Sequence, residues 1–299
     1  MESEIQRIMR ILGGVGSRKI LERQTSRRQL DEGLQSGELV RIARGCYALP
    51  AVSDASMLAV RATGVVCLTN AALSWGWGVK TIPDKPHVAV PKDRRLSKEL
   101  AQLITPSWID LAHDETEGYA TTEAKTLEMC GRRLPFDEAL AITDSALRAG
   151  YPHEALREAA NIAKGPGSAR LRRVAGAADK RAANPFESVL RGIALEVPGL
   201  SVEPQVQIRG ELGLDVRPDL VDRRHRIVLE ADSFEWHSDR AALRRDARRY
   251  DLLVVNDWMV LRFSWEDVMH DQAWVRAVLV AAAAGRTGQR PMQAPLLPH

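Results

Sequence analysis

The sequence is poor in cysteine and has no long apolar run. Its 299 residues include three cysteines, Cys46, Cys67 and Cys130, which form no Cys-x-x-Cys pair and have no pair of histidines nearby. This spacing predicts neither a disulfide framework nor a zinc site, so a reducing, cytoplasmic location is expected. The longest run of small apolar residues, 278–284, is far shorter than the ~20 residues that cross a bilayer, and the chain starts with acidic residues. We therefore expect no membrane partner.

A strong excess of charge of either sign is also lacking. The net charge is +3 at pH 7 and the isoelectric point is near 8.8, which is too mildly basic to indicate nucleic-acid binding by itself. With 45% hydrophobic and 27% charged residues, the composition is that of a folded chain with two or three domains. The distribution of the charges is more informative than their sum.

The first 50 residues have the pattern of a winged helix. Three helices are predicted, over residues 2–12, 17–24 and 27–36. Thr25 and Ser26 offer N-cap hydroxyls to the third helix, and Gly37 stands at a typical left-handed C-cap. Residues 39–49 then predict two short strands with Gly45 near their turn. Three helices and a β-hairpin in this order are typical of winged-helix DNA-binding domains.

Basic residues are concentrated in this segment. They are Arg18, Lys19, Arg23, Arg27, Arg28, Arg41 and Arg44, against the acids Glu22, Asp31, Glu32 and Glu38. Arg27 and Arg28 open the third helix, where a recognition helix meets the major groove, and Arg41 and Arg44 lie on the wing, within reach of phosphates. The alternative is a solvated basic face on a small helical cap. Because charge and topology agree, we expect contact with double-stranded DNA.

The remaining regions differ in how clearly their patterns can be interpreted. We expect an α+β protein with a winged helix at 1–50, a mixed α/β region of unclear role at 51–175, a third domain at 184–285 and a flexible tail at 286–299. The middle region carries no catalytic constellation, and Trp75, Trp77 and Trp108 are interpreted as packing residues. The glycine-rich segment 164–168, followed by several arginines, is the best candidate for a boundary. It is either a linker that faces DNA or a hinge before a solvated helix.

The third domain is predicted to have the order αβββαβα. Its helices and strands are expected at 184–197, 202–209, 214–221, 226–232, 239–253, 258–263 and from Ser264 to Gly285. In the third strand, the period of two places Glu230 and Asp232 on one face. Asp219 precedes Glu230 by a gap that fits two antiparallel strands joined by the polar turn 222–225. Three carboxylates can then converge on one point of the sheet.

Clustered carboxylates have a physical reason to bind a hard divalent cation, because each raises the pKa of the others until a cation neutralises them. Such a cation acidifies water and stabilises charge on a scissile phosphate. Glu187 is a candidate fourth acid, and the alternative for it is a capping-box residue. For Asp232, the alternative is that it caps the next turn. His237 could relay a proton or contact the phosphate, and the alternative is a surface histidine.

Arginines on the helix after the third strand could hold the DNA backbone. They are Arg240, Arg244, Arg245, Arg248 and Arg249, of which we name Arg244, Arg245 and Arg248 as DNA-binding candidates. Because the same helix contains Asp239, Asp246 and Asp251, an intrahelical ion-pair face is the alternative.

Two resemblances cover most of the chain. The head resembles the winged helix of AbiEi-type antitoxins in Ser26-Arg27-Arg28-Gln29-Leu30, Ser36-Gly37-Glu38-Leu39-Val40 and Arg44-Gly45-Cys46-Tyr47-Ala48. The tail resembles the domain related to very-short-patch-repair (Vsr-like) endonucleases, a branch of the PD-(D/E)XK nuclease fold. It does so in Glu187-Ser188-Val189-Leu190-Arg191, Pro204-Gln205, Asp219, Glu230-Ala231-Asp232, His237, Arg245-Asp246 and Trp258-Met259-Val260-Leu261-Arg262-Phe263. This combination of domains is of actinobacterial type.

The second resemblance implies roles for the acids. It places three acids, Asp219, Glu230 and Asp232, at metal-binding positions. Glu187 corresponds to the helix acid, and His237 corresponds to the histidine after the third strand. Asp232 stands where the general fold has a lysine, so the cation for the transition state must come from elsewhere or from the metal. Ser233 stands where a glycine is common in this branch. Its side chain narrows the space through which a backbone phosphate would approach.

Two functional hypotheses follow. In the first, the protein is a DNA endonuclease or nickase that uses Mg²⁺ or Mn²⁺ for phosphodiester hydrolysis and is steered by the winged helix. In the second, it is a non-enzymatic transcriptional repressor, the antitoxin of a toxin–antitoxin pair, which binds DNA with both end domains and has a cognate toxin as a further partner.

Overall fold

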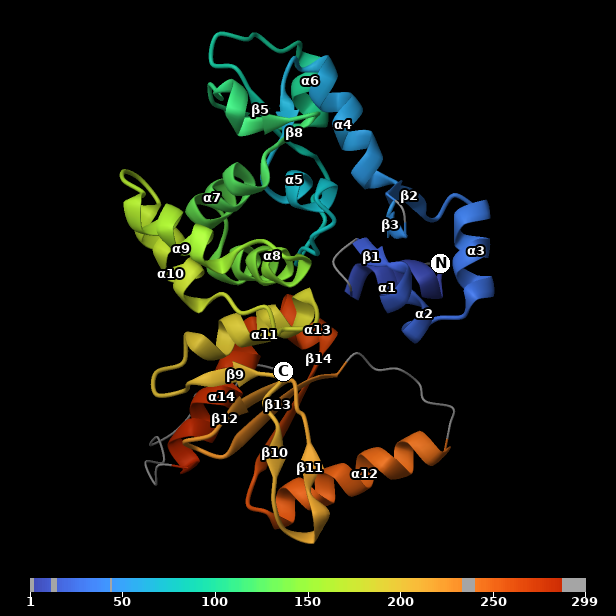
Figure 1. The fold of residues 1–299 in the computed structure, drawn as a ribbon, viewed down its shortest axis with the longest axis vertical. Helices are drawn as coiled ribbons and strands as arrows, with labels where there is room; N and C mark the ends of the chain where they lie inside the picture. Colours follow the sequence, from blue (N-terminus) through green and yellow to red (C-terminus); the bar gives the residue numbers. More distant parts are fainter. Residues whose placement is uncertain (1–2, 12–14, 44, 233–239, 287–299) are drawn as a thin grey trace. The chain divides into compact units, whose positions relative to one another are not determined.

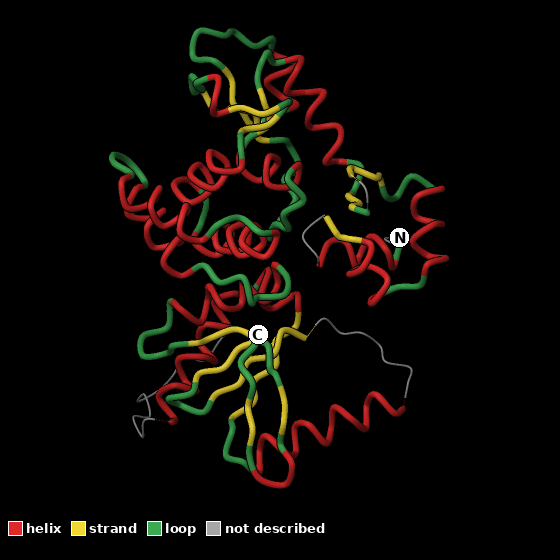
Figure 2. Tube along the Cα trace, viewed as in Figure 1, coloured by secondary structure: helices red, strands yellow, loops and turns green. Residues whose placement is uncertain are grey.

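The computed structural model describes residues 3–11, 15–43, 45–232 and 240–286. It is a mixed helix-and-strand structure, which confirms the predicted α+β class (Figure 1). The chain divides into two compact units, Met1–Pro185 and Phe186–His299. Figure 2 shows the helices and the strands of each unit in separate colours. Within the described ranges, no helix has both the length and the apolar character needed to span a bilayer.

The first unit begins with three helices and a small sheet. Its elements are α1 (Glu4–Ile11), β1 (Val15–Ser17), α2 (Arg18–Gln24), α3 (Arg27–Gln35), β2 (Val40–Ala43) and β3 (Cys46–Ala48). Ser26 caps α3, since its hydroxyl accepts from the Gln29 amide while the Gln29 side chain accepts from the Ser26 amide. Leu21, Leu30 and Tyr47 belong to the core of this part. The three helices and the hairpin therefore follow the predicted order.

A third strand in this small sheet was not predicted. β1 pairs with β3 in antiparallel register, with Val15 opposite Ala48. This strand occupies the start of the segment that the sequence assigned to the second helix, which begins at Arg18 instead of Ser17. The partner of β1 lies about 30 residues further along the chain, so no local pattern indicates the pairing.

The rest of the first unit combines a mixed sheet with a layer of helices. Its elements are α4 (Ala51–Arg61), β4 (Val65–Val66), α5 (Leu68–Ser74), β5 (His87–Val90), α6 (Lys98–Leu103), β6 (Thr105–Trp108), η1 (His113–Glu115), β7 (Thr116–Glu117), β8 (Ala120–Thr121), α7 (Glu123–Arg133), α8 (Phe136–Ala149), α9 (His153–Ile162) and α10 (Ser168–Ala177). The strand order is β6-β5-β4-β8-β7. Trp77 is 1% exposed, as a packing residue should be, whereas the side chain of Trp108 on the edge strand is largely in solvent.

The glycine-rich segment 164–168 is a tight connection between helices and not a boundary between units. Gly167 has φ +79°, and a β-carbon there would lie 2.7 Å from the Arg132 carbonyl oxygen. Arg170 donates to the Arg132 carbonyl at 3.2 Å, and Arg172 donates to the Ala163 carbonyl at 3.2 Å. These arginines therefore bind main-chain carbonyls of neighbouring helices. The two units separate after Pro185, which corrects the boundary expected at 164–168.

The second unit is built around a four-stranded sheet. Its elements are α11 (Pro185–Leu195), β9 (Val202–Pro204), β10 (Ile208–Arg209), η2 (Glu211–Gly213), β11 (Asp215–Val216), β12 (Leu220–Asp222), β13 (Ile227–Asp232), α12 (Arg240–Val255), β14 (Met259–Ser264), α13 (Trp265–His270) and α14 (Gln272–Arg286). The order is β14-β13-β12-β9, and only β13 and β14 run parallel. One core cluster packs Leu253 of α12 against Val221, Val228 and Val260 of the sheet.

Three predicted elements of this unit are broken in two. The strands expected at 202–209 and 214–221 each divide, and their outer halves pair separately as the β10–β11 ribbon. The first break falls at Gln205, whose φ of +56° lies outside the strand region. The last helix, predicted as continuous from the Ser264 cap, is interrupted at Asp271, which has φ −127° and ψ +56°. The tail expected at 286–299 lies almost wholly outside the described residues.

Candidate functional site

Two acidic residues face each other across the centre of the second sheet. β12 and β13 are antiparallel, with Leu220 opposite Leu229, and this register places Asp219, one residue before β12, opposite Glu230. The Ala231 amide donates to a carboxylate oxygen of Asp219 at 2.9 Å. The adjacency that the sequence spacing predicted for Asp219 and Glu230 is therefore present, and both carboxylates lie on the face that packs against α12.

The turn between these strands is itself held by buried polar groups. The Asp222 carboxylate accepts from the Ser201 amide at 2.7 Å and from the His225 amide at 2.8 Å, and it lies 3.2 Å from His225 Nδ1. Neither Asp222 nor His225 is exposed to solvent beyond 7%. Because buried polar groups without partners are costly, these bonds fix the register on which the acidic pair depends.

Burial raises the pKa of both acids, and repulsion by the neighbouring carboxylate adds to the rise at Glu230. Glu230 is 6% exposed, and burial together with the nearby Asp219 carboxylate raises the pKa of Glu230 to about 8. Burial also raises the pKa of Asp219, although the Ala231 amide opposes this rise. Without a cation, the pair therefore retains a proton near neutral pH. Two close carboxylates in this condition are the oxygen donors that a hard divalent ion prefers.

Gln205 joins a third acid to this pair. Its side-chain amide donates to Glu187 Oε2 at 3.2 Å and to Asp219 Oδ1 at 3.3 Å, and its backbone amide donates to the Asp219 carbonyl at 2.8 Å. Glu187 is 4% exposed on α11. The structure thus places Glu187 one bridging residue away from Asp219. No role was predicted for Gln205, although Pro204-Gln205 is one of the segments on which the nuclease resemblance rests.

Asp232 is engaged differently from the other two acids of the predicted triad. Its carboxylate forms an ion pair with Arg262, which lies opposite Glu230 in the parallel register of β13 and β14. Among the described residues, no group of three or more acidic, histidine or cysteine side chains has the geometry of a metal centre. The strand register places Asp219 and Glu230 opposite each other, and Asp232 stands beside them in its own ion pair.

Two arginines that sequence reasoning did not select complete the site. Arg249 of α12 donates to Glu230 Oε1 at 2.5 Å. The guanidinium carbons of Arg262 and Arg249 lie 4.7 Å and 5.9 Å from the centre of the Tyr250 ring. Arg249 belongs to a basic segment of the sequence, and Arg262 belongs to a segment of the nuclease resemblance. Only the packing of α12 and β14 shows that these two arginines reach the acids. They supply positive charge beside the acids.

The DNA-binding candidates of α12 lie beside this site on the same helix. Arg244, Arg245 and Arg248 are all exposed, whereas Asp246 is half-buried. Among the described residues, none of these three arginines forms an ion pair with an acid of the helix, and Asp239 lies outside the described residues. His237, the remaining catalytic candidate, lies outside the described residues.

Arg18, Arg27 and Arg28 of the head are exposed and form local ion pairs. Arg18 and Arg27 both approach Glu22, at 2.8 Å and 3.2 Å, and Arg28 pairs with Glu32 at 2.8 Å. The Arg18 guanidinium lowers the pKa of Glu22. The capped start of α3 presents Arg27 and Arg28 to solvent.

The other basic candidates of the head are described to different extents. Arg23 and Arg41 are exposed. The side chain of Lys19 and the whole of Arg44 lie outside the described residues.

Comparison with known proteins yields relatives without a stated activity. No family model matches the chain. Two proteins from strains of Mycobacterium tuberculosis, named uncharacterized protein MT2308 and uncharacterized protein Rv2248, are each 26% identical to it, over 82% of this chain and 93% of theirs. Among solved structures, the RV2827C protein from Mycobacterium tuberculosis is 16% identical, with a TM-score of 0.30, over 69% of this chain and 87% of that one.

Proposed function

We propose that this protein binds double-stranded DNA through its N-terminal helices and hydrolyses phosphodiester bonds at the Asp219–Glu230 pair. The observation that carries the proposal is the placement of a buried carboxylate, Glu230, opposite the half-buried Asp219 on adjacent strands, with a raised pKa on both. Such a pair is stabilised when a divalent cation replaces its proton. The exposed arginines of α3 and α12 support binding to phosphates.

Mg²⁺ or Mn²⁺ fits this donor set, because Asp219 and Glu230 offer only oxygen ligands. When bound, the ion supplies an acidified water and neutralises charge on the scissile phosphate. The chain contributes the rest: Gln205 orients the Asp219 carboxylate, and the Ala231 amide fixes its second oxygen. Arg249 is a cation in contact with the pair, so it takes the part of the missing lysine by stabilising the negative charge of the phosphate.

A nicking assay on supercoiled DNA with Mg²⁺ or Mn²⁺ tests the proposal. We expect Glu230→Ala to lower cleavage by about 100-fold or more, because it removes one of the two carboxylates, while DNA affinity stays near that of the wild type. Asp251→Asn, which changes an exposed acid on α12, is the matched control and should cleave normally. Cleavage by Glu230→Ala at the wild-type rate would refute the role of the pair.

One observation favours the second candidate function, a DNA-binding repressor without turnover. Both Glu230 and Asp232 already have arginine partners, so the acids are neutralised without a metal ion. On this alternative, neither the wild type nor Glu230→Ala cleaves DNA, and both bind a discrete site near their own promoter in the presence of a chelator. Measuring cleavage and binding on the same two variants therefore distinguishes the two functions.

A further inference from the structure

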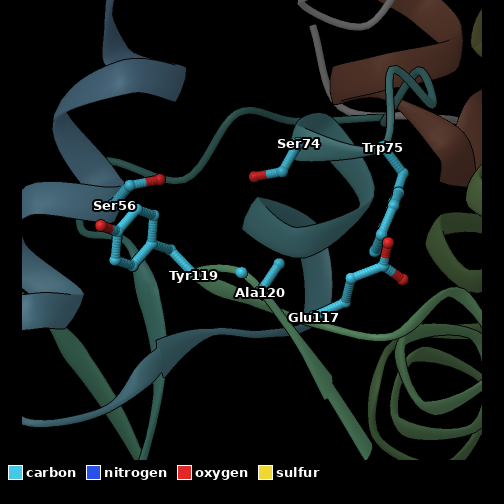
Figure 3. Close-up of a pocket in the computed structure, with 7 residues that line it drawn as sticks. Ser56, Ser74, Trp75, Glu117, Tyr119 and Ala120 are labelled. Atoms are coloured by element: carbon cyan, nitrogen blue, oxygen red, sulfur yellow. The ribbon is translucent and has the colours of Figure 1, made fainter.

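A pocket in the first unit lies apart from every residue considered so far for DNA binding or cleavage. It has a volume of about 310 Å³ and lies where α4 and α5 meet the β7–β8 hairpin. Figure 3 shows Trp75 beside Glu117 on one side of this pocket and Tyr119 beside Ser56 on the other. The hydroxyl of Ser74 points into the space between these two sides. The volume is at the lower end of the range for small-molecule sites, and it suits a single side chain.

The hairpin that forms one wall is built to present an aromatic ring. Glu117 pairs with Ala120 in the β7–β8 register, so Gly118 and Tyr119 form a two-residue turn. Gly118 has φ +60°, the conformation that such a turn requires and that glycine adopts without strain. Tyr119 is held at the tip by its carbonyl, which accepts from the Val66 amide at 2.8 Å, while 63% of the residue is exposed.

The polar groups of the pocket are committed in a way that leaves mainly acceptors. Ser74 donates its hydroxyl proton to the Asn70 carbonyl at 3.0 Å, so only its lone pairs face the pocket. Trp75 donates its indole N–H to the Thr121 carbonyl at 2.9 Å and therefore offers its ring face but no donor. Glu117 adds a full negative charge. The hydroxyls of Ser56 and Tyr119 can donate or accept, so the Glu117 carboxylate is the group that requires donors from an occupant.

Charge identifies the occupant further. Glu115 is paired with Lys125 at 2.8 Å, whereas Glu117 forms no ion pair with any described residue. None of the seven residues that line the pocket is basic, so a phosphate group would meet a carboxylate without a compensating cation. Two aromatic rings, a carboxylate and hydroxyl acceptors are the groups that surround a guanidinium or an ammonium ion in proteins.

We propose that this pocket binds a cationic side chain, arginine or lysine, of a partner polypeptide. The Trp75 and Tyr119 rings contact the apolar stem and the face of the cation, and Glu117 neutralises its charge. The proposal does not depend on the acidic pair of the second unit, and it gives the middle of the chain a role in binding protein instead of DNA.

The test is a titration of the full-length protein with blocked amino acids. N-acetyl-arginine amide is the cationic probe, and N-acetyl-citrulline amide, which has nearly the same shape without the charge, is the neutral one. Binding is followed by the NMR shift of the Trp75 indole N–H, assigned with Trp75→Phe. We expect saturable shifts with the arginine probe at millimolar concentrations and no saturable shift with the citrulline probe.

Variants identify the groups responsible. Glu117→Gln should weaken the affinity for the arginine probe by about tenfold, since the cation loses its counter-charge but the pocket keeps its shape. Glu158→Gln, which changes an exposed acid of α9, is the control and should bind normally. Equal binding of the two probes, wild-type binding by Glu117→Gln, or no shift with either probe would each overturn the proposal. Unchanged circular dichroism spectra establish that both variants are folded.

Discussion

The arginines of the head and of the second unit form ion pairs in very different surroundings. In the head, Arg27 and Arg28 are 79% and 85% exposed as side chains; Arg27 pairs with Glu22 of α2, and Arg28 with Glu32 of its own helix. In the second unit, Arg249 is 29% exposed and pairs with Glu230, which is almost fully buried. Pairs in water are weak and easily exchanged for phosphate, whereas a pair at a buried carboxylate controls protonation. Burial, more than the number of charges, distinguishes a binding surface from a reactive site.

The largest expected effect is a pH dependence that belongs to the second unit alone. Because the pKa of Glu230 is about 8, a proton competes with a divalent ion below that pH. We expect the affinity for Mn²⁺, measured by calorimetry, to rise by roughly tenfold per pH unit between pH 6 and 8 and to level off above pH 8. DNA binding by the head should stay nearly constant over this interval, since the pKa of Glu22 is lowered and that acid is ionised throughout. A flat Mn²⁺ affinity would contradict the assignment.

The same titration predicts how stability depends on pH in the metal-free chain. A carboxyl whose pKa is raised on folding contributes stability that is complete below its ordinary pKa of 4.5 and is lost as pH rises through about 8. The Tm measured with a chelator should therefore fall between pH 5 and pH 9 in the wild type and fall less in Glu230→Gln, which cannot ionise. Identical profiles for the two proteins would contradict the raised pKa.

A smaller effect is expected in the head. The double substitution Arg27→Ala with Arg28→Ala removes two exposed guanidiniums, so DNA affinity should fall by about tenfold and the dependence of its logarithm on log salt should decrease by about 2. Tm should scarcely change, because both pairs are solvent-exposed. Filter binding over a salt series measures the first effect. Arg157→Ala on α9 is the control, and an equal loss with that variant would mean that the head has no special role.

The smallest effect isolates one backbone angle. Gln205→Ala removes two side-chain hydrogen bonds and should lower the free energy of unfolding by about 2 kcal/mol. Gln205→Gly removes the same bonds but adopts φ +56° without strain, so its loss should be about 1 kcal/mol smaller. Urea unfolding compares the two. Cleavage should decrease to the same extent in both, and a greater loss of stability with glycine would rule out strain at this residue.

The sequence was sufficient where the information is local. The gap between Asp219 and Glu230 and the polar turn inside it predicted the antiparallel adjacency, and the Ser26 cap predicted the start of α3. These features depend on neighbours within about a dozen residues. Alternation along the third strand likewise placed Glu230 and Asp232 on a common face, as the register with β14 shows.

What the sequence could not supply is contact between distant segments. Arg249 and Arg262 each belong to an element that follows the acidic strands in the chain. Which acid each arginine contacts depends on how α12 and β14 pack. The break at Gln205 depends on its bonds to Asp219 and Glu187, which belong to other elements. The pairing of β1 with β3 has the same origin. Periodicity describes one element at a time and contains none of these relations.

The order of the site along the chain has a consequence for its synthesis. The bond between Asp219 and Ala231 joins residues 12 apart, whereas Glu230 meets Arg249 across 19 residues and Asp232 meets Arg262 across 30. The β12–β13 hairpin with its acids therefore leaves the ribosome before either arginine does. During that interval the carboxylates can be neutralised only by protons or by ions from solution. Ions of the surrounding solution can thus reach this pair before the arginines of the chain do.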